Sequence, residues 1–265
     1  TAAALWCVGN LYLVHRSIGS IGVPRRLGNL EIFEALPRPH LLVAATGLGL
    51  LLAAALSHRA DDWWYSRALL GAYTPLGALD PVLGRDLAYY LFALPWQRTV
   101  HSYLTVMSGL VLGLVAVLYA AVGAVRWHDR RLQVSDVARK HLAGLLIAFA
   151  VALYWGYRLE PAEYVAGVHD VPLDDVLIRI RLPSARFLGV LAIIAGGLSL
   201  VWMWVRPLRV ALVPWCVLAV VSLFAHYAVP GFAGSVRPAR ELELPDVEGA
   251  RPRLLEAAYG IAAAV

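Results

Sequence analysis

The strongest constraint in this sequence is a set of separated apolar runs, each close to the length that crosses a bilayer as a helix. A transmembrane helix needs about 20 apolar residues. Backbone polar groups in lipid must bond within their own segment, so these runs should be helical, and they lack the strict alternation of barrel strands. We therefore predict an all-α, polytopic transmembrane helix bundle of about six spans. The predicted spans are 1–14, 41–56, 103–125, 142–157, 187–205 and 210–229.

Composition excludes an ordinary soluble domain. Hydrophobic residues make up 60% of the chain and charged residues 15%, whereas soluble domains are about half apolar and a quarter charged. The net charge of +5 comes from basic residues that cluster in the predicted loops, where such residues set orientation, so nucleic acid is not an expected partner. Cys7 and Cys216 lie in apolar runs and are expected to be buried thiols. Because Thr1 is not methionine, we expect a signal segment or a further helix ahead of it.

The predicted organisation is a transmembrane bundle over residues 1–229 and an extracytoplasmic, polar C-terminal tail over residues 230–265. Two long loops, 57–101 and 158–183, are expected on the outer side, the first as an amphipathic connection at the membrane surface. Short helices are expected around 30–36, at the interface, and around 253–264, in the tail.

Charge asymmetry between the loops predicts the orientation. Basic residues are denser in loops 15–39, 126–140 and 206–209 than in loops 57–101 and 158–183. Loops rich in Lys and Arg stay in the cytoplasm. The longer, more acidic loops and the tail are therefore expected on the outer side. The short run 206–209 should form a tight antiparallel turn between the last two spans.

Side chains that could carry chemistry are placed at span ends or in loops. Several histidines fall at predicted span ends and are expected to be interfacial rather than cofactor ligands: His40, His58, His101, His141 and His226. No acidic or basic residue falls in the middle of a predicted span, which argues against a proton-coupled transporter.

The outer acidic residues are expected to be solvated or to pair with arginines, although a calcium site remains an alternative. They are Asp61, Asp62, Asp80, Asp86, Asp170, Asp174 and Asp175. No hydrolase, zinc-protease or phosphate-loop motif is present in the sequence. We therefore predict no catalytic residue, no metal ligand and no cofactor.

Two further patterns concern local structure. Apolar residues alternate with arginines over 176–182, which predicts an extended segment before Pro183. Small residues such as Gly109, Gly113, Gly196 and Gly197 lie within the spans and permit close contact between helices.

The stretch 79–95 is the feature around which we expect the bundle to be organised. Its prolines fix φ, and Gly84 allows a turn that a side chain would hinder. We predict an ordered cap on the outer surface rather than a loose loop. In this cap Asp86 should accept hydrogen bonds from backbone N–H groups or pair with an arginine, since an unpaired half-buried carboxylate is costly. The aromatic side chains should be buried or lie at the headgroups.

The run DPVLGRDLAYYLFALP resembles the motif DPxFGxDxxFYxFxLP of the bacterial uncharacterised protein family (UPF) 0182, integral membrane proteins. The matching residues are Asp80, Pro81, Gly84, Asp86, Tyr90, Phe92, Leu94 and Pro95. Leu83 and Tyr89 stand where the family has phenylalanines. Trp64, the run LIRIRLP at 177–183 and parts of the tail also resemble the family, with Ala239 and Arg240 replacing its Asn-Glu pair. The resemblance implies a bacterial cytoplasmic (inner) membrane protein, of which this chain resembles the membrane half.

Three hypotheses about function remain open. The first is a structural or accessory subunit of a larger membrane complex, such as a respiratory or photosynthetic one, with the bilayer and other membrane subunits as partners and no catalysis of its own. The second is a component of a transporter or channel for small or lipid-like solutes. The third is a membrane enzyme that uses the acidic outer loops.

Overall fold

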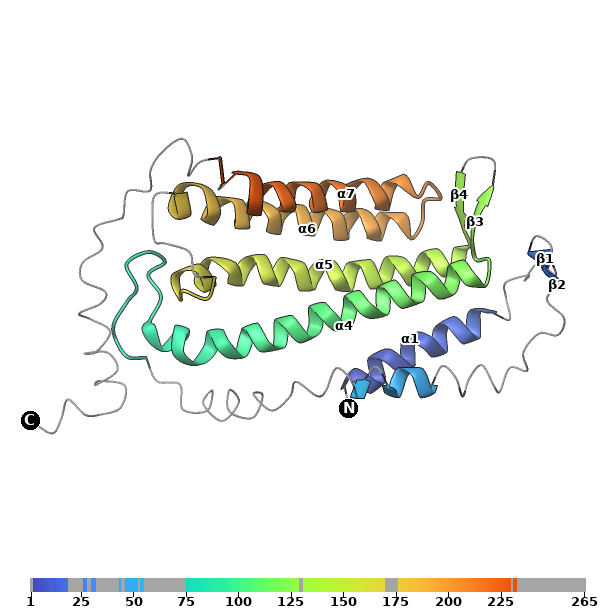
Figure 1. The fold of residues 1–265 in the computed structure, drawn as a ribbon, viewed down its shortest axis with the longest axis horizontal. Coiled ribbons are helices and arrows are strands. Elements are labelled where there is room, and N and C mark those ends of the chain that lie inside the picture. Colours follow the sequence, from blue (N-terminus) through green and yellow to red (C-terminus); the bar gives the residue numbers. More distant parts are fainter. Residues whose placement is uncertain are drawn as a thin grey trace, which may run out of the picture. The chain divides into compact units, whose positions relative to one another are not determined.

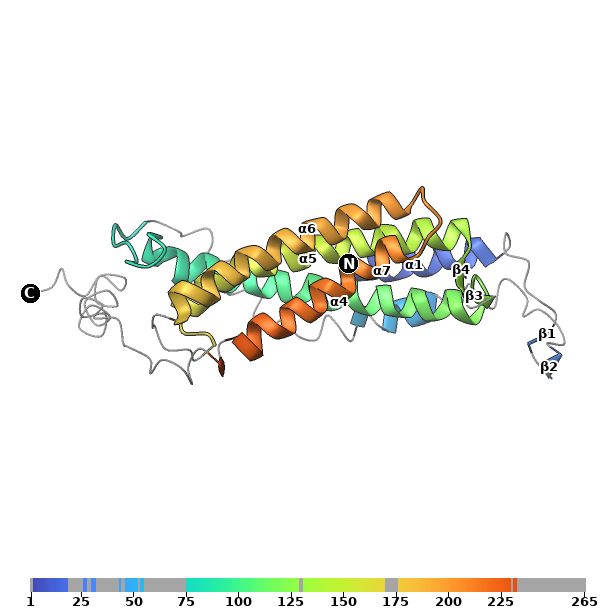
Figure 2. The ribbon, with the colours of Figure 1, turned by 90° about the horizontal axis from the view of Figure 1, so that it is seen from above.

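The computed structural model describes residues 2–18, 26–27, 30–31, 43, 46–51, 53–54, 75–128, 131–169, 176–229 and 231–232. Most of these residues are helical (Figures 1 and 2). The helices are α1 (Ala2–Ile18), α4 (Leu94–Ala121), α5 (Asp136–Val165), α6 (Leu182–Trp202) and α7 (Arg209–Leu223). Three π-helical turns adjoin them: η1 (Tyr89–Ala93), η2 (Leu177–Arg181) and η3 (Phe224–Ala228). The strands are β1 (Arg26–Leu27), β2 (Leu30–Glu31), β3 (Val125–His128) and β4 (Arg131–Val134).

Four helices of the described part of the chain are long and apolar enough to cross a membrane. With their π-helical turns they cover Tyr89–Ala121, Asp136–Val165, Leu177–Trp202 and Arg209–Ala228. The prediction of a mostly helical fold with helices of membrane length is therefore confirmed. The first predicted span, 1–14, forms α1, which is not one of the four. In the second, 41–56, the described residues 43, 46–51 and 53–54 are helical.

The helices extend further than the apolar runs that predicted them. The supposed outer loop 158–183 is helical over 158–165 and again from 177, and loop 57–101 is helical from 89. Hydropathy marks the apolar part of a helix, but backbone hydrogen bonding continues into the polar turns beyond it. The expectation of loops was therefore wrong for these segments, whereas residues 57–74, 170–175 and 253–264 lie outside the described part.

The extended segment predicted over 176–182 is also wrong, because this segment forms η2 and the start of α6. Leu177 and Leu182 are its buried residues and pack in a cluster with Tyr164. They lie five residues apart, about one turn of a π helix, so burial follows a helical period rather than the alternation of apolar residues and arginines. The interfacial helix expected around 30–36 begins instead as β2, which pairs antiparallel with β1.

The basic segment 126–140 contains structure of its own. Strands β3 and β4 form an antiparallel hairpin in which Val125 pairs with Val134 and His128 with Arg131. Helix α5 begins immediately after it, at Asp136. Asp136 pairs with Arg139 at 2.9 Å in the first turn, where an acidic side chain complements the positive end of the helix dipole.

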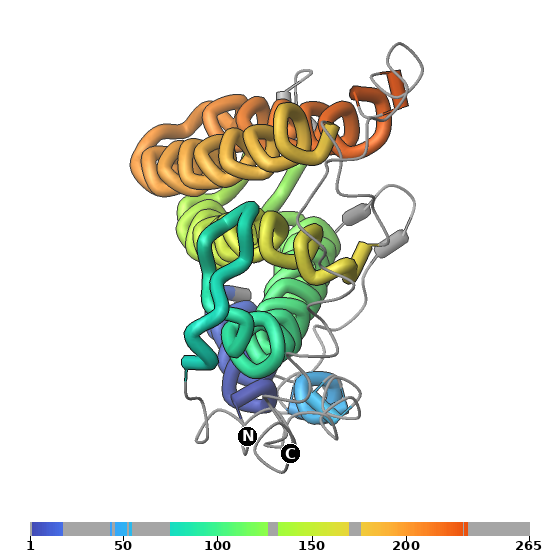
Figure 3. Tube along the Cα trace, turned by 90° about the vertical axis from the view of Figure 1, so that its left-hand side faces the viewer, coloured from blue at the N-terminus to red at the C-terminus, as the bar shows by residue number. Residues whose placement is uncertain are grey.

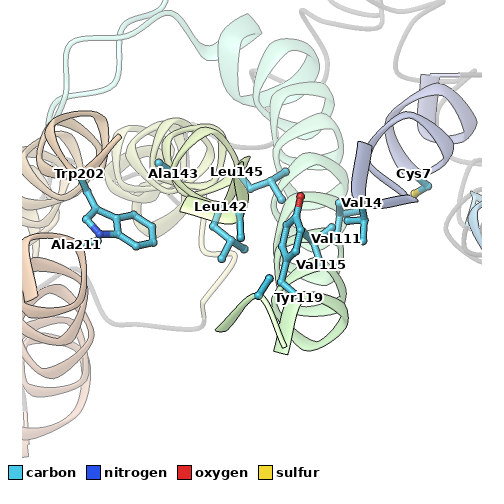
Figure 4. Packing of buried hydrophobic residues seen from close by; sticks show 12 residues of the cluster. Cys7, Val14, Val111, Val115, Tyr119, Leu142, Ala143, Leu145, Trp202 and Ala211 are labelled. Atoms are coloured by element: carbon cyan, nitrogen blue, oxygen red, sulfur yellow. The ribbon is translucent and has the colours of Figure 1, made fainter. Parts of the chain in front are cut away.

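The chain folds into two compact units. Unit 1 comprises residues 1–61, 101–155 and 189–220, and unit 2 comprises residues 62–100, 156–188 and 221–265. The largest apolar core lies in unit 1 and joins residues of α1, α4, α5, α6 and α7 (Figure 4). Cys7, Val115 and Tyr119 are fully buried in this core, and Trp202 is almost fully buried. Cys7 thus matches the prediction of a buried thiol, whereas Cys216 is exposed on α7.

Helices α6 and α7 lie side by side (Figures 1 and 3). Residues 203–208 alone connect them, so the tight turn predicted around 206–209 is confirmed. Within unit 1, Trp215 Nε1 on α7 donates to Ser199 Oγ on α6 at 2.9 Å, and Trp215 stacks on Phe149 of α5 with ring centroids 5.6 Å apart. In lipid, such packing and polar contacts rather than water exclusion hold helices together.

Helices α5 and α6 approach each other closely at Gly196. A Cβ atom added there would lie 2.9 Å from the Cβ of Ala150, whereas one added at the neighbouring Gly197 would meet nothing within 4 Å. Of the pair singled out in the sequence, Gly109 faces Phe149 and Gly113 faces open space. Of the adjacent pair Gly196 and Gly197, Gly196 is therefore the one that the packing of α5 against α6 requires.

We predict that Gly196→Ala lowers the thermal stability of the detergent-solubilised chain. Overpacking typically costs about 1–3 kcal/mol, which outweighs the gain of about 0.8–1 kcal/mol in helix propensity. Gly197→Ala is the matched control, and it should keep or raise stability because its new methyl group meets nothing. Equal effects of the two substitutions on the melting temperature would contradict the assigned α5–α6 contact.

Candidate functional site

Asp80 organises the turn that precedes the first membrane-length helix. Its Oδ1 accepts a hydrogen bond from Val82 N at 2.8 Å, and its Oδ2 accepts bonds from Leu83 N and from the Tyr90 hydroxyl, each at 2.8 Å. The residue is only 6% exposed. Gly84 closes the turn with φ +65°, where a residue without Cβ is favoured, and donates its N–H to Asp80 O at 2.9 Å. One carboxylate thereby joins the turn to η1.

Asp86 caps the helix that follows this turn. Its carboxylate accepts bonds from Leu76 N at 3.0 Å, Gly77 N at 2.9 Å and Ala88 N at 2.8 Å. The bond from Ala88 has the geometry of an N-cap, in which an acid satisfies a backbone N–H that the helix itself leaves free. The N–H groups of Leu76 and Ala88 hold the pKa of Asp86 below its ordinary value. The backbone bonds expected for Asp86 are therefore confirmed.

The other residues of the motif have supporting positions. Leu94 is buried, Tyr90 and Phe92 are half-buried in η1, and Pro81 and Pro95 are exposed. Arg85 lies over the Tyr89 ring at 4.3 Å from its centroid, and the rings of Tyr89 and Tyr90 meet edge to face. The motif residues thus shape and cap a helix start, and the oxygens of Asp80 and Asp86 are engaged by backbone and hydroxyl donors.

A second polar cluster in unit 2 joins α5 to η3 and η2. Glu160 and Tyr164 lie one turn apart on α5, and the Tyr164 hydroxyl donates to Glu160 Oε1 at 2.6 Å. His226 of η3 places its Nε2 at 2.8 Å from the same Oε1. Arg181 of η2 lies over the Tyr164 ring, 5.6 Å from its centroid. We call Glu160, Tyr164, Arg181 and His226 the unit 2 polar cluster.

Neighbouring groups extend this polar region. Glu163 accepts from Arg98 Nε through Oε1 and contacts His169 Nε2 through Oε2, both at 3.0 Å. Ser222 lies between Tyr157, whose hydroxyl donates to Ser222 Oγ at 3.2 Å, and the His226 ring. The described residues of unit 2 therefore contain two Glu–His pairs, of which Glu160–His226 lies wholly on helical segments.

Sequence reasoning missed the unit 2 polar cluster. It assigned Glu160 and Arg181 to a loop and His226 to a span end, because the apolar run of α5 stops several residues before the helix does. The sequence nevertheless contained a signal for the π-helical turns that carry Arg181 and His226. Each described π-helical turn ends two residues before a proline in the sequence, namely Pro95, Pro183 and Pro230.

A hydrogen-bond network in unit 1 links three helices around His141. The His141 ring contacts the Tyr119 hydroxyl at 3.0 Å through Nδ1 and Asn10 Oδ1 at 2.9 Å through Nε2. Ser17 Oγ donates to the Tyr119 hydroxyl at 3.1 Å. These bonds connect α1, α4 and α5 and leave both ring nitrogens engaged.

Metal binding finds no support in the described part of the chain. There, no three His, Cys, Asp or Glu side chains lie close enough together to hold a metal ion. Of the acidic residues considered for calcium, Asp80 and Asp86 bind donors of the protein itself, and the remaining ones, Asp61, Asp62, Asp170, Asp174 and Asp175, lie outside the described residues.

Four apolar helices of membrane length, with polar side chains paired among themselves, fit a helical membrane protein. The chain belongs to the uncharacterised protein family UPF0182, whose family model matches residues 1–241. The resemblance seen in the motif is thereby confirmed.

Relatives come from several bacteria. A UPF0182 protein of Geobacter sulfurreducens is 30% identical over 197 residues, which cover 70% of this chain and 22% of the relative. One of Geobacter sp. strain M21 is 29% identical over 76% of this chain and 23% of the relative, and one of Salinibacter ruber is 30% identical over 63% and 17%. The chain thus spans about a fifth of the length of the curated relatives it matches. No solved structure matches it.

We predict that Asp86→Ala loosens the turn, lowers the melting temperature at neutral pH and opens residues 76–88 to proteases. Because the pKa of folded Asp86 is lowered, its contribution should be present above the ordinary carboxyl pKa of about 3.9 and lost as pH falls through the lower folded value. The difference from wild type should therefore shrink in acid. Leu79→Ala, at an exposed position of the same turn, is the control, and equal proteolysis of wild type and Asp86→Ala would argue against the cap.

Proposed function

We propose that this chain is a structural or accessory subunit of a larger membrane complex and performs no catalysis of its own. The observation that carries this proposal is that much of the apolar surface of the membrane-length helices is not buried by other parts of the described chain. The apolar stretch of α7 is only 11% buried, and large apolar side chains such as Leu212, Val217 and Val220 point outward. A surface of this kind suits lipid and neighbouring membrane subunits. Within the described residues, the carboxylates of Asp80, Asp86 and Glu160 are engaged by donors of the chain itself.

The proposal includes a location. The protein crosses the bacterial cytoplasmic (inner) membrane about six times, with its C-terminal tail on the outer side. Support comes from the dense basic residues of 126–140 and 206–209, which the positive-inside rule assigns to the cytoplasm. The β3–β4 hairpin would then face the cytoplasm, and the turn that follows α5 would face outward.

Native purification tests the functional proposal. The tagged protein, in its full natural length, is extracted in mild detergent or polymer nanodiscs and analysed by native mass spectrometry. We expect other membrane proteins in fixed stoichiometry. A protein that runs alone in every extraction would contradict the accessory role.

Cysteine labelling tests the orientation. In a chain without Cys7 and Cys216, a cysteine at Gln133 in β4 should react with a membrane-impermeant maleimide only after the cells are opened. A cysteine at Ala166, in the turn after α5, should react in cells whose outer membrane alone is permeable. Both positions are exposed, so burial would not confuse the result. The reverse pattern would overturn the assignment.

A specific observation favours a second candidate, a component of a transporter or channel for small or lipid-like solutes. The sequence argued against a proton-coupled transporter, because no acidic or basic residue was expected in the middle of a span and Glu160 was assigned to a loop. Glu160 and His226 instead lie within membrane-length helical segments, and such residues often mark ion or proton pathways. Purification of the protein by itself with a bound solute would support this candidate over the first.

A further inference from the structure

The hydrogen bonds of His226 define which of its ring nitrogens carries a proton. Nδ1 lies 2.8 Å from the backbone oxygen of Ser222. A carbonyl oxygen can only accept, so Nδ1 must be the donor in this contact. Turning the ring by 180° would replace both nitrogens by carbon atoms and lose both polar contacts. The position of the Nδ1 proton therefore follows from the geometry of η3.

The other nitrogen then requires a second proton. In a neutral imidazole whose Nδ1 is protonated, Nε2 has a lone pair and no hydrogen. Nε2 lies 2.8 Å from Glu160 Oε1, an oxygen that also accepts from the Tyr164 hydroxyl at 2.6 Å. Two lone pairs at this distance repel, so a proton must lie between Nε2 and Oε1. It is held either as imidazolium with carboxylate or as imidazole with carboxylic acid.

We propose that Glu160 and His226 form a proton-binding site, in which one shared proton joins α5 to η3. Binding forms one N–H or O–H bond and needs no co-reactant, since the proton comes from water and returns to it. When the proton leaves, neutral His226 keeps its bond to Ser222 O but faces the Glu160 carboxylate with a lone pair. The contact between α5 and η3 then becomes repulsive and opens.

The surroundings favour a site rather than an incidental surface pair. The Glu160 side chain is 11% exposed and the His226 side chain 29% exposed, whereas the His169 side chain of the neighbouring Glu163–His169 pair is 42% exposed. Limited access to water raises the cost of leaving a polar group unpaired. Glu160 lies on a membrane-length helix, and ionisable residues within a membrane are commonly functional.

The backbone supplies an independent observation. His226 lies in η3, and Arg181, which faces Tyr164, lies in η2. Short π-helical turns within α-helices occur frequently at functional sites. All three π-helical turns of the described residues lie in unit 2, and two of them bring charged side chains to Glu160 and Tyr164.

Other titratable side chains surround the Glu160–His226 pair and could contribute to a change with pH. Tyr157 and Tyr164 lie on α5 itself, and Arg181 on η2 faces Tyr164. Glu163 is engaged by Arg98 of α4 and by His169. Among these neighbours His169 is the second histidine that contacts a glutamate, and it is therefore the group to control for.

Nitrogen NMR of the wild-type chain in nanodiscs tests the site directly. With ¹⁵N-histidine label, and with His226→Gln used only to assign the signal, His226 should show a protonated Nδ1 at every pH at which the chain is folded. Its Nε2 should carry or share a proton at pH 6 and lose it as pH rises. A folded chain in which Nδ1 is unprotonated, or in which Nε2 never changes, would overturn the proposal.

Thermal unfolding against pH gives a second test. Wild type should lose stability as pH rises, because loss of the shared proton replaces a hydrogen bond by repulsion. The expected fall in melting temperature is about 2–4 °C, the size associated with one hydrogen bond in a chain of this length. Glu160→Gln should remove this fall, since an amide N–H can donate to Nε2 of neutral His226 without a bound proton.

His169→Gln is the matched control, because it removes the more exposed histidine of the same unit. It should keep the wild-type pH dependence. If His169→Gln abolishes the fall while Glu160→Gln keeps it, the titrating group is His169 and the proposal is wrong. These measurements use the isolated chain, so their outcome is independent of whether partner subunits are found.

Discussion

Satisfaction of backbone hydrogen bonds without water is the constraint on which the rest of this structure depends. In a bilayer, an unpaired N–H or C=O costs several kcal/mol, and a helix meets this cost within one segment. The same requirement explains the polar turn at 75–86, where the chain is not yet helical. There the carboxylates of Asp80 and Asp86 accept from backbone N–H groups that no helix satisfies. The family motif is thus the local solution to starting a membrane helix.

Prolines modify this backbone pattern in a consistent way. Each described π-helical turn closes with an N–H that reaches back five residues, from Leu94, Leu182 and Val229, and each of these residues precedes a proline in the sequence. A proline has no N–H and its ring crowds the carbonyl of the preceding turn. A wider turn just ahead of it relieves that crowding. Proline alone is not sufficient, because Pro161 and Pro214 lie inside α5 and α7 without such a turn.

The π-helical turns also affect where polar side chains lie. A π-helical turn rotates the side chains that follow it relative to an α-helix, and in unit 2 it brings His226 and Arg181 to the Glu160–Tyr164 pair. Unit 1 has no π-helical turn among its described residues, and its His141 donates through Nε2 to Asn10 Oδ1 and can accept the Tyr119 hydroxyl at Nδ1. The two histidines therefore differ in kind. A neutral His141 satisfies both of its contacts, because its Nε2 donates to an amide oxygen and its Nδ1 faces a hydroxyl. His226 faces a carbonyl oxygen at Nδ1 and a carboxylate oxygen at Nε2, so a neutral ring leaves one contact without a proton.

Sequence reasoning correctly predicts the membrane-type helical fold, the family, the tight turn between α6 and α7 and the backbone bonds of Asp86. All of these depend on local composition or on residues close together in the chain, where hydropathy, turn residues and caps act directly. Tertiary packing was needed to show that 176–182 is helical, that Gly196 is closely packed whereas Gly113 and Gly197 face open space, and that Glu160 meets His226. These depend on which faces of distant segments pack together. Sequence alternation and residue spacing carry no information about the partner that lies 66 positions away.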